Sequence, residues 1–137
     1  MIWSIRQVER MYTLPCAFAS VFRDAVVEAY NQGDLVWIHG FQLLLLPAFV
    51  SRRLAAARIG VFLHTPFPSA EIYVTLPLRK EILRGVLAAN LVGFQIYDYV
   101  RHFMNSCSRV LRRASPLRRM RACVTFRSVS RSAYRTS

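Results

Sequence analysis

The stretch that most constrains the fold is Arg58–Ser69, RIGVFLHTPFPS. Its first half, Arg58–Leu63, is a short apolar run with β-branched and aromatic residues, which is typical of a buried strand. His64 follows, and Pro66 and Pro68 prevent the strand from continuing because proline fixes φ and has no N–H group. The sequence therefore predicts a strand whose carboxyl end delivers a titratable side chain into a stiff loop.

Helical and strand patterns alternate on both sides of this stretch. Apolar residues recur at helical spacing from Phe18 to Tyr30, in a segment that Pro15 opens and Gly33 closes. Strands are predicted at 35–39 and 90–95, and helices at 43–54, between Ser69 and Pro77, at 78–89 and at 97–111. Alternating strands and helices build a parallel sheet through right-handed crossovers. We therefore predict an α/β fold with a parallel sheet and flanking helices.

The strand at 35–39 is a nearly continuous apolar run that contains Val36, Trp37 and Ile38. Such runs are typical of parallel strands that are covered on both faces. We therefore predict that Trp37 lies in the core and is not a platform for stacking against sugars.

Three of the predicted strands end at polar residues, which are His39, His64 and Gln95. The carboxyl ends of parallel strands meet at one edge, where ligands bind in open α/β sheets. We therefore predict that the three side chains share a rim that faces a ligand. Ordinary polarity at strand ends is the alternative, and the pattern alone leaves it open.

Composition limits the class of protein. The chain has 137 residues, which suits one domain, and its 54% hydrophobic content excludes a disordered protein. The apolar zone Val36–Val50 is short and interrupted, so we expect no membrane span, and the first ten residues lack the pattern of a secretory signal. An odd number of cysteines without metal spacing favours a reduced, cytoplasmic setting; they are Cys16, Cys107 and Cys123.

The net charge of +12 is concentrated near the carboxyl terminus. Residues 1–110 hold eleven Arg or Lys against seven Asp or Glu, whereas residues 111–137 hold eight arginines and no acidic residue. Arginine runs bind phosphate without sequence preference, so a nucleic-acid binder is one hypothesis. It ranks third, because Phe126 and Tyr134 are the only aromatic residues of this tail and a stacking surface needs more.

Three segments form a specific combination in this order: GDLVWIHGFQLLLLP, RIGVFLHTPFPSAEIYVTLPLRKEILRGVL and NLVGFQIYDYVRHFMNSCSRVL. They resemble the trehalose-6-phosphate synthases, glycosyltransferase family 20. The resemblance implies that residues 12–110 are part of the Rossmann-like N-terminal domain of a GT-B glycosyltransferase. Residues 111–137 are then expected to be a non-homologous, irregular, Arg/Ser-rich tail.

The resemblance implies a retaining glucosyl transfer from UDP-glucose to glucose 6-phosphate, which gives trehalose 6-phosphate and UDP in trehalose biosynthesis. It implies no metal and no other cofactor. His64 matches the family histidine near the reacting centre, so it is the expected catalytic and substrate-binding residue. Thr65 and Gln95 are expected to bind substrate, and His39 to be structural near the site. His102 is interpreted as a partly exposed helical residue and not as a ligand.

The chain departs from the family pattern after His39. Gly40-Phe41-Gln42 stands where the family has Asp-Tyr-His, and that aspartate contacts the acceptor sugar. Losing such a charge-assisted hydrogen bond typically costs ~1.5–3 kcal/mol. The glycine-rich loop and the C-terminal domain with its Arg/Lys pair have no counterpart in this sequence. We therefore expect that this chain alone does not catalyse the transfer. A non-catalytic regulatory or interaction module, associating with a full-length synthase, is the alternative.

Overall fold

Four short strands form one parallel sheet in the order β1-β2-β3-β4. The computed structural model describes residues 19–111 and 122–125. The strands are β1 (Leu35–His39), β2 (Arg58–Leu63), β3 (Leu91–Phe94) and β4 (Ala122–Thr125). The first two have the bounds that the sequence predicts, and the third is shorter by one residue at each end. Neighbouring strands are in register, with Ile38 opposite Val61 and Val61 opposite Val92.

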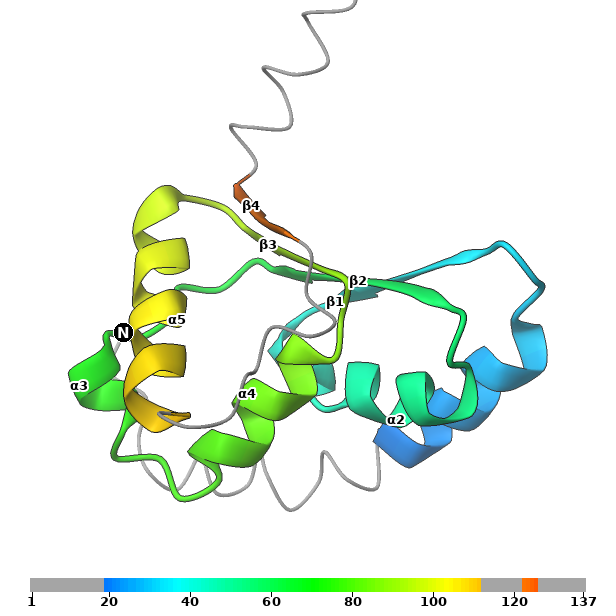
Figure 1. Ribbon diagram of the computed structural model, residues 1–137, viewed down its shortest axis with the longest axis horizontal. Helices are drawn as coiled ribbons and strands as arrows, with labels where there is room; N and C mark the ends of the chain where they lie inside the picture. The colour runs from blue at the N-terminus through cyan, green and yellow to red at the C-terminus, as the bar shows by residue number, and fades with distance from the viewer. Residues whose placement is uncertain (1–18, 112–121, 126–137) are drawn as a thin grey trace, which may run out of the picture.

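Helices connect successive strands. They are η1 (Phe41–Leu43, a 3-10 turn), α2 (Leu46–Arg53), α3 (Ala70–Tyr73), α4 (Arg79–Leu87) and α5 (Tyr97–Val110), and residues 19–29 are also helical. Figure 1 shows α2, α4 and the helix of residues 19–29 below the sheet, and α5 beside its left end. The strand order explains this arrangement, because right-handed crossovers that all advance in one direction place their helices on the same face.

The opposite face of the sheet, here called the open face, is formed by Leu35, Trp37, His39 and Phe62. We predicted that both faces of β1 are covered and that Trp37 lies in the core. For the described residues both predictions are wrong. Leu35 is 63% exposed and Trp37 is 41% exposed. The Trp37 ring lies directly over Gly60, where a Cβ atom would collide with it. The aromatic ring thus packs on the backbone of the neighbouring strand and not under a helix.

The structure differs from three further sequence predictions. The helix predicted from residue 43 begins at Leu46, because Pro47 is suited to the first turn and the 3-10 turn η1 precedes it. Of the apolar residues predicted to face inward between Phe18 and Tyr30, Val26 and Tyr30 pack against the core, whereas Val21 is 69% exposed. The tail was expected to be irregular, yet Ala122–Thr125 pair with β3 as a parallel strand. The rest of the tail and residues 15–18 lie outside the described residues.

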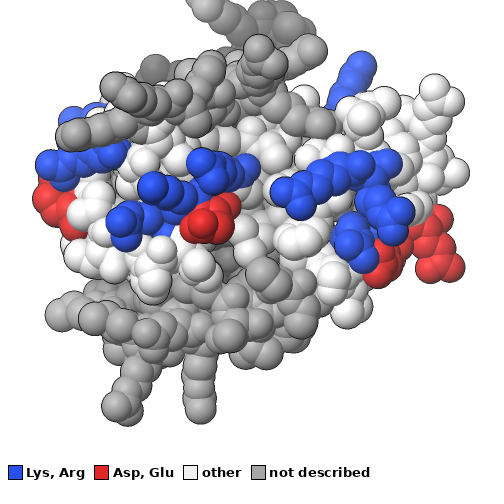
Figure 2. All heavy atoms as spheres, turned by 60° about the horizontal axis from the view of Figure 1, so that its bottom comes forward, with Lys and Arg blue, Asp and Glu red and all other residues white. Residues whose placement is uncertain are grey.

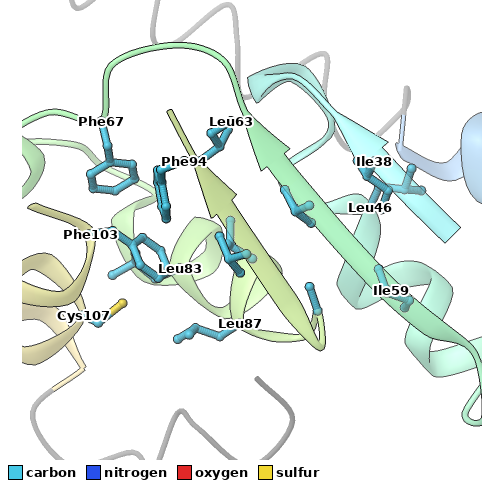
Figure 3. Close-up of a cluster of buried hydrophobic side chains, with 14 of the residues drawn as sticks. Ile38, Leu46, Ile59, Leu63, Phe67, Leu83, Leu87, Phe94, Phe103 and Cys107 are labelled. Atoms are coloured by element: carbon cyan, nitrogen blue, oxygen red, sulfur yellow. The ribbon is translucent and has the colours of Figure 1, made fainter. Parts of the chain in front are cut away.

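The core lies between the helices and the inward face of the sheet (Figure 3). Alternate residues of β2, namely Ile59, Val61 and Leu63, are at most 2% exposed. The apolar stripe of α4 is also buried, and three of its four residues belong to the same cluster as these β2 residues: Leu83, Val86 and Leu87, with Ile82 as the fourth. Burial of such a contiguous cluster is the dominant favourable contribution to folding.

The remaining helix surface is charged. Figure 2 shows Lys and Arg side chains spread over the face that the helices form. Arg52 and Arg53 in the last turn of α2, and Lys80 and Arg84 of α4, are exposed. This agrees with a solvated face. Within residues 19–111 and 122–125, no helix is both long enough and apolar enough to cross a membrane.

Asn90 joins β2 to β3 at the amino ends of both strands. Its Oδ1 accepts a hydrogen bond from the Ile59 N–H at 2.8 Å, and its own N–H donates to the Ile59 carbonyl at 2.8 Å. We expect Asn90→Ala to lower the free energy of unfolding by about 1–3 kcal/mol, because it removes the acceptor of a buried N–H. Urea denaturation measures this. Asn105→Ala, on the exposed surface of α5, is the control, and equal losses in both variants would contradict the assignment.

Two thiols of the described residues lie where α5 packs against β4. Cys107 of α5 and Cys123 of β4 are free, and Cys107 is 7% exposed. Burial raises the pKa of Cys107 from 9.0 to about 12, with the Cys123 thiol adding to the effect, and raises the pKa of Cys123 to about 11. The folded Cys107 thiol therefore keeps its proton between pH 9 and about 12, and the Cys123 thiol between pH 9 and about 11, where the thiols of the unfolded chain lose theirs. The contribution of these two protonated thiols to stability is thus fully present below pH 9 and is lost as the pH rises through these windows.

This burial gives a test at alkaline pH. Between pH 8 and pH 10.5, Cys107 is expected to account for about 2 kcal/mol of the loss in the free energy of unfolding. Cys107→Ala should therefore show a smaller loss over that interval than the parent chain, whatever its stability at pH 8. Urea denaturation at the two pH values provides the comparison. An identical loss in both proteins would show that burial does not keep the Cys107 thiol protonated at pH 10.5.

Candidate active site

Two histidines meet where β1 and β2 end. His39 is the last residue of β1 and His64 is the first residue after β2. His39 Nδ1 lies 2.9 Å from His64 Nε2, and the two rings are 22° from parallel with centroids 5.1 Å apart. A hydrogen bond between two imidazoles needs one donor and one acceptor, so at least one ring is neutral. Both residues are exposed, and the pair can therefore offer hydrogen-bonding groups to a ligand.

Aromatic side chains of the open face flank this histidine pair. Trp37 meets the His39 ring edge-on with centroids 6.0 Å apart, and Phe62 lies 4.8 Å from the His64 ring and 6.3 Å from the His39 ring. These contacts follow from the strand register, because His39 and Phe62 are direct partners across β1 and β2. Cross-strand aromatic pairs limit the rotation of both imidazoles.

The loop after His64 is anchored by one aromatic side chain. Phe67, between the two prolines, is 7% exposed and stacks on Tyr73 with ring centroids 5.2 Å apart. It also meets Phe103 and Phe94 edge-on, with ring centroids 5.4 Å and 6.1 Å away. The three rings lie close together in Figure 3. The loop is thus held by α3, α5 and β3 together, which fixes the point from which His64 leaves β2.

His102 holds the same loop by a hydrogen bond. Its Nδ1 lies 3.1 Å from the Phe67 carbonyl, and a carbonyl only accepts, so His102 carries a proton on Nδ1. The side chain is half-buried on α5, as expected for a partly exposed helical residue. Its role in positioning the loop was missed from the sequence, because no local pattern links residues 35 positions apart.

Glu71 and Arg109 also connect α3 to α5, with an ion pair of 2.8 Å. Hydrogen bonding by its own backbone N–H lowers the pKa of Glu71, and Arg109 adds to this effect. Asp98 lies 3.9 Å from Arg101 within α5. Both carboxylates therefore have cationic partners, and each lies in the first turn of its helix, where a negative charge is stabilised by the helix dipole.

Gln95 reaches the same edge from β3. It follows Phe94, whose partner in β2 is Leu63, the residue immediately before His64. The backbones of His64 and Gln95 therefore leave neighbouring parallel strands side by side. His39, His64 and Gln95 all stand at the carboxyl edge of the sheet, although only the two histidines are in mutual contact among the hydrogen bonds described.

Residues 5–134 match the family model described as glycosyltransferase family 20. The chain belongs to glycosyltransferase family 20. This membership agrees with the resemblance carried by the three segments. The match extends beyond Val110, where the resemblance read from the sequence ends.

Family members with known names and structures are similar over part of their length. Alpha,alpha-trehalose-phosphate synthase [UDP-forming] 1 of Arabidopsis thaliana is 53% identical over 91 residues, which are 66% of this chain and 10% of that protein. The N-terminal domain of Candida albicans trehalose-6-phosphate phosphatase is 40% identical, with a TM-score of 0.69, over 71% of this chain and 21% of that one. An E. coli structure bound with UDP-2-fluoro glucose is 29% identical, with a TM-score of 0.68, over 70% and 21%.

These comparisons define the fold and its extent. The chain spans about a tenth of the Arabidopsis synthase and about a fifth of the two solved chains. The predicted fold class, a partial Rossmann-like parallel sheet from a GT-B glycosyltransferase, is confirmed. The roles of the individual site residues are not tested by these similarities and stay predictions.

The residue after His39 is constrained by the backbone as well as by the family pattern. Gly40 has φ +89°, in the left-handed region that favours glycine, and its N–H donates to the Phe62 carbonyl at 3.3 Å. A Cβ atom there would lie 2.8 Å from Gln42 Oε1. The Gln42 side chain could move, but the positive φ would remain, so an aspartate at this position would require a different backbone conformation.

Proposed function

We propose that this chain supplies part of the sugar-binding cleft of a UDP-forming alpha,alpha-trehalose-phosphate synthase, which transfers glucose from UDP-glucose to glucose 6-phosphate with retention. The observation that carries this proposal is the contact between His39 and His64 at the carboxyl edge of the sheet, in a chain of this family. The similarity to an E. coli structure bound with UDP-2-fluoro glucose supports it. A cytoplasmic location belongs to the same proposal, and the free thiols of Cys107 and Cys123 support it.

Each residue at the edge has a distinct role in this proposal. His64 is the catalytic residue, because an exposed imidazole can donate a hydrogen bond to a sugar hydroxyl or accept one from it. His39 positions it, since the 2.9 Å contact selects the tautomer of the His64 ring. Thr65 and Gln95 bind substrate on either side of His64.

The chain alone is proposed to be inactive. A departing UDP needs preorganised cationic groups near its phosphates. In this family the resemblance assigns those groups to the C-terminal domain, and this chain spans about a fifth of the similar solved chains. The glycine at position 40 also removes the carboxylate that would orient the acceptor.

A binding and turnover experiment tests both parts of the proposal. UDP-glucose and glucose 6-phosphate are added to the full chain, UDP release is assayed, and weak binding is followed by ligand-observed NMR. We expect no UDP release, and a binding signal that His64→Ala reduces. Arg58→Ala is the matched control, because Arg58 begins the same strand at its opposite end and is exposed. Turnover above that of His64→Ala would refute the inactivity, and equal binding by His64→Ala and the parent would refute the site.

A non-catalytic regulatory or interaction module is the second candidate. Two observations favour it: the glycine at position 40, and the 40% identity to the N-terminal domain of a protein named as a trehalose-6-phosphate phosphatase. A pull-down with a full-length synthase discriminates between the two candidates. Specific recovery of the synthase, with no change when His64 is replaced, would favour the module over the cleft.

A further inference from the structure

The hydrogen bond between His39 and His64 depends on the protonation of both rings. We propose that the pair is a pH-sensitive switch, which is closed while at least one ring is neutral and opens when both rings are charged. His39 Nδ1 and His64 Nε2 are 2.9 Å apart, the distance of a direct hydrogen bond in which one nitrogen donates and the other accepts. Imidazoles change charge between pH 5 and pH 8, so acidification supplies the charges that open the pair.

The two protonation steps have opposite effects on this contact. With both rings neutral, the N–H of one ring donates to the nitrogen lone pair of the other. One added proton makes the donor an imidazolium and strengthens the bond, since charge-assisted hydrogen bonds are roughly twice as strong as neutral ones. A second added proton occupies the accepting lone pair, so that the bond is lost and two positive rings face each other. The contact therefore survives the first proton and is broken by the second.

The immediate surroundings of the pair carry no negative charge that would hold two imidazolium rings together. The rings in contact with the pair belong to Trp37 and Phe62, and the 3-10 turn η1 contains only uncharged residues. Gln95, which reaches the same edge from β3, is also neutral. Within residues 19–111 and 122–125, no ion pair includes either histidine.

The charged side chains of the neighbouring elements lie at the other edge of the sheet or have partners of their own. Asp34 precedes β1 and Arg58 begins β2, at the ends of these strands opposite to the pair. Glu71 of α3 and Asp98 of α5 are each paired with an arginine of α5. Repulsion between two charged rings is therefore unopposed, and because both histidines are exposed, the rings can separate into solvent.

Opening changes side-chain positions at the carboxyl edge without requiring the strands to move. The register of β1 and β2 is held by buried neighbours such as Ile38 and Val61, which are direct partners. The His64 ring would lose the bond that fixes its orientation. The switch itself needs only the two imidazoles, whereas its consequence for a sugar rests on the proposed function: the site would be ordered at neutral pH and would lose its positioned imidazole in acid.

NMR of the unaltered full chain at pH 8 and pH 5 tests the switch. Nuclear Overhauser effects between the ring protons of His39 and His64 are expected at pH 8, because the ring centroids are 5.1 Å apart, and should be lost at pH 5. The contact of His102 with the Phe67 carbonyl is the internal control. Its Nδ1–H donates in both charge states of the ring, so this contact should persist at pH 5.

Three outcomes of this experiment would overturn the switch. One is a contact between His39 and His64 that persists at pH 5, and another is a contact that is already absent at pH 8. The third is loss of the His102 contact together with that of the pair, which would mean that acid unfolds the chain and that the pair does not open locally.

The consequence for the sugar site is tested by the affinity for UDP-glucose at the same two pH values. Glucose 6-phosphate is unsuitable here, because a phosphate monoester itself takes up a proton near about pH 6. The parent chain is expected to lose affinity by about 2- to 10-fold at pH 5, which corresponds to one hydrogen bond. His39→Gln should lose less, because glutamine stays neutral and can still accept a hydrogen bond from charged His64.

Arg58→Ala is the matched control, because Arg58 lies at the opposite end of β2, and it should show the loss of the parent. Equal losses in the parent and in His39→Gln would overturn the link between the switch and the sugar site. Absence of UDP-glucose binding at both pH values would refute the proposed function, and the contact measured by NMR would still decide the switch.

Discussion

Replacement of Phe67 by alanine is expected to lower the free energy of unfolding by about 3–5 kcal/mol. The ring is 7% exposed and is enclosed by Tyr73, Phe94 and Phe103, whose ring centroids lie between 5.2 and 6.1 Å away. Its removal would lose the transfer free energy of a large side chain and leave a cavity that the two adjacent prolines keep from collapsing. Urea denaturation followed by circular dichroism measures the change.

Tyr97→Ala is the control for this variant. Tyr97 is an aromatic residue of α5 that is 68% exposed, so its loss should change the free energy of unfolding by about 0.5 kcal/mol or less. Comparable losses for the two variants would show that Phe67 does not anchor the loop after His64.

Gly85→Val is expected to destabilise the fold by about 3 kcal/mol, at the upper end of the range for overpacking. Gly85 lies where α4 crosses the segment before α2. A Cβ atom there would lie 2.7 Å from the Leu44 carbonyl oxygen and 3.1 Å from the Leu45 Cα. These are backbone atoms, so the two helices would have to separate to accommodate the new side chain. Thermal and urea denaturation of the variant measure the loss.

Gly60→Ala is the comparison for Gly85→Val, because Gly60 is also approached closely, but by a side chain. The three atoms nearest to a Cβ atom at Gly60 all belong to the Trp37 ring, and that side chain is 41% exposed and can move away from the sheet. The expected loss is therefore smaller than that of Gly85→Val. A larger loss at Gly60 would mean that the open face is packed more tightly than the helix contact.

Local patterns were sufficient to predict the elements that form the site. The apolar runs that end at His39 and His64 gave β1 and β2 their bounds, and the helix predicted at 78–89 is α4, at Arg79–Leu87. The meeting of the strand ends at one edge follows from parallel pairing alone. The side chains of His39 and His64 are in contact because the two strands that carry them are neighbours and end at this edge.

Features that depend on strand order or on distant contacts could not be predicted. An apolar strand has the same sequence whether helices cover one face or two, and the consecutive order β1-β2-β3-β4 is what leaves Trp37 on an open face. The bond from His102 to the Phe67 carbonyl joins residues far apart in the chain. The strand at 122–125 was hidden by the Arg- and Ser-rich composition around it.

The measurement that tests the central claim most directly is a map of backbone amide shifts in the ¹⁵N-labelled chain on addition of UDP-glucose and glucose 6-phosphate. If the carboxyl edge of the parallel sheet is the sugar site, the shifts will concentrate at His39, His64, Thr65 and Gln95, and the opposite strand ends at Leu35, Arg58 and Leu91 will not move. Shifts confined to those opposite ends or to the helices would contradict a sugar site at this edge.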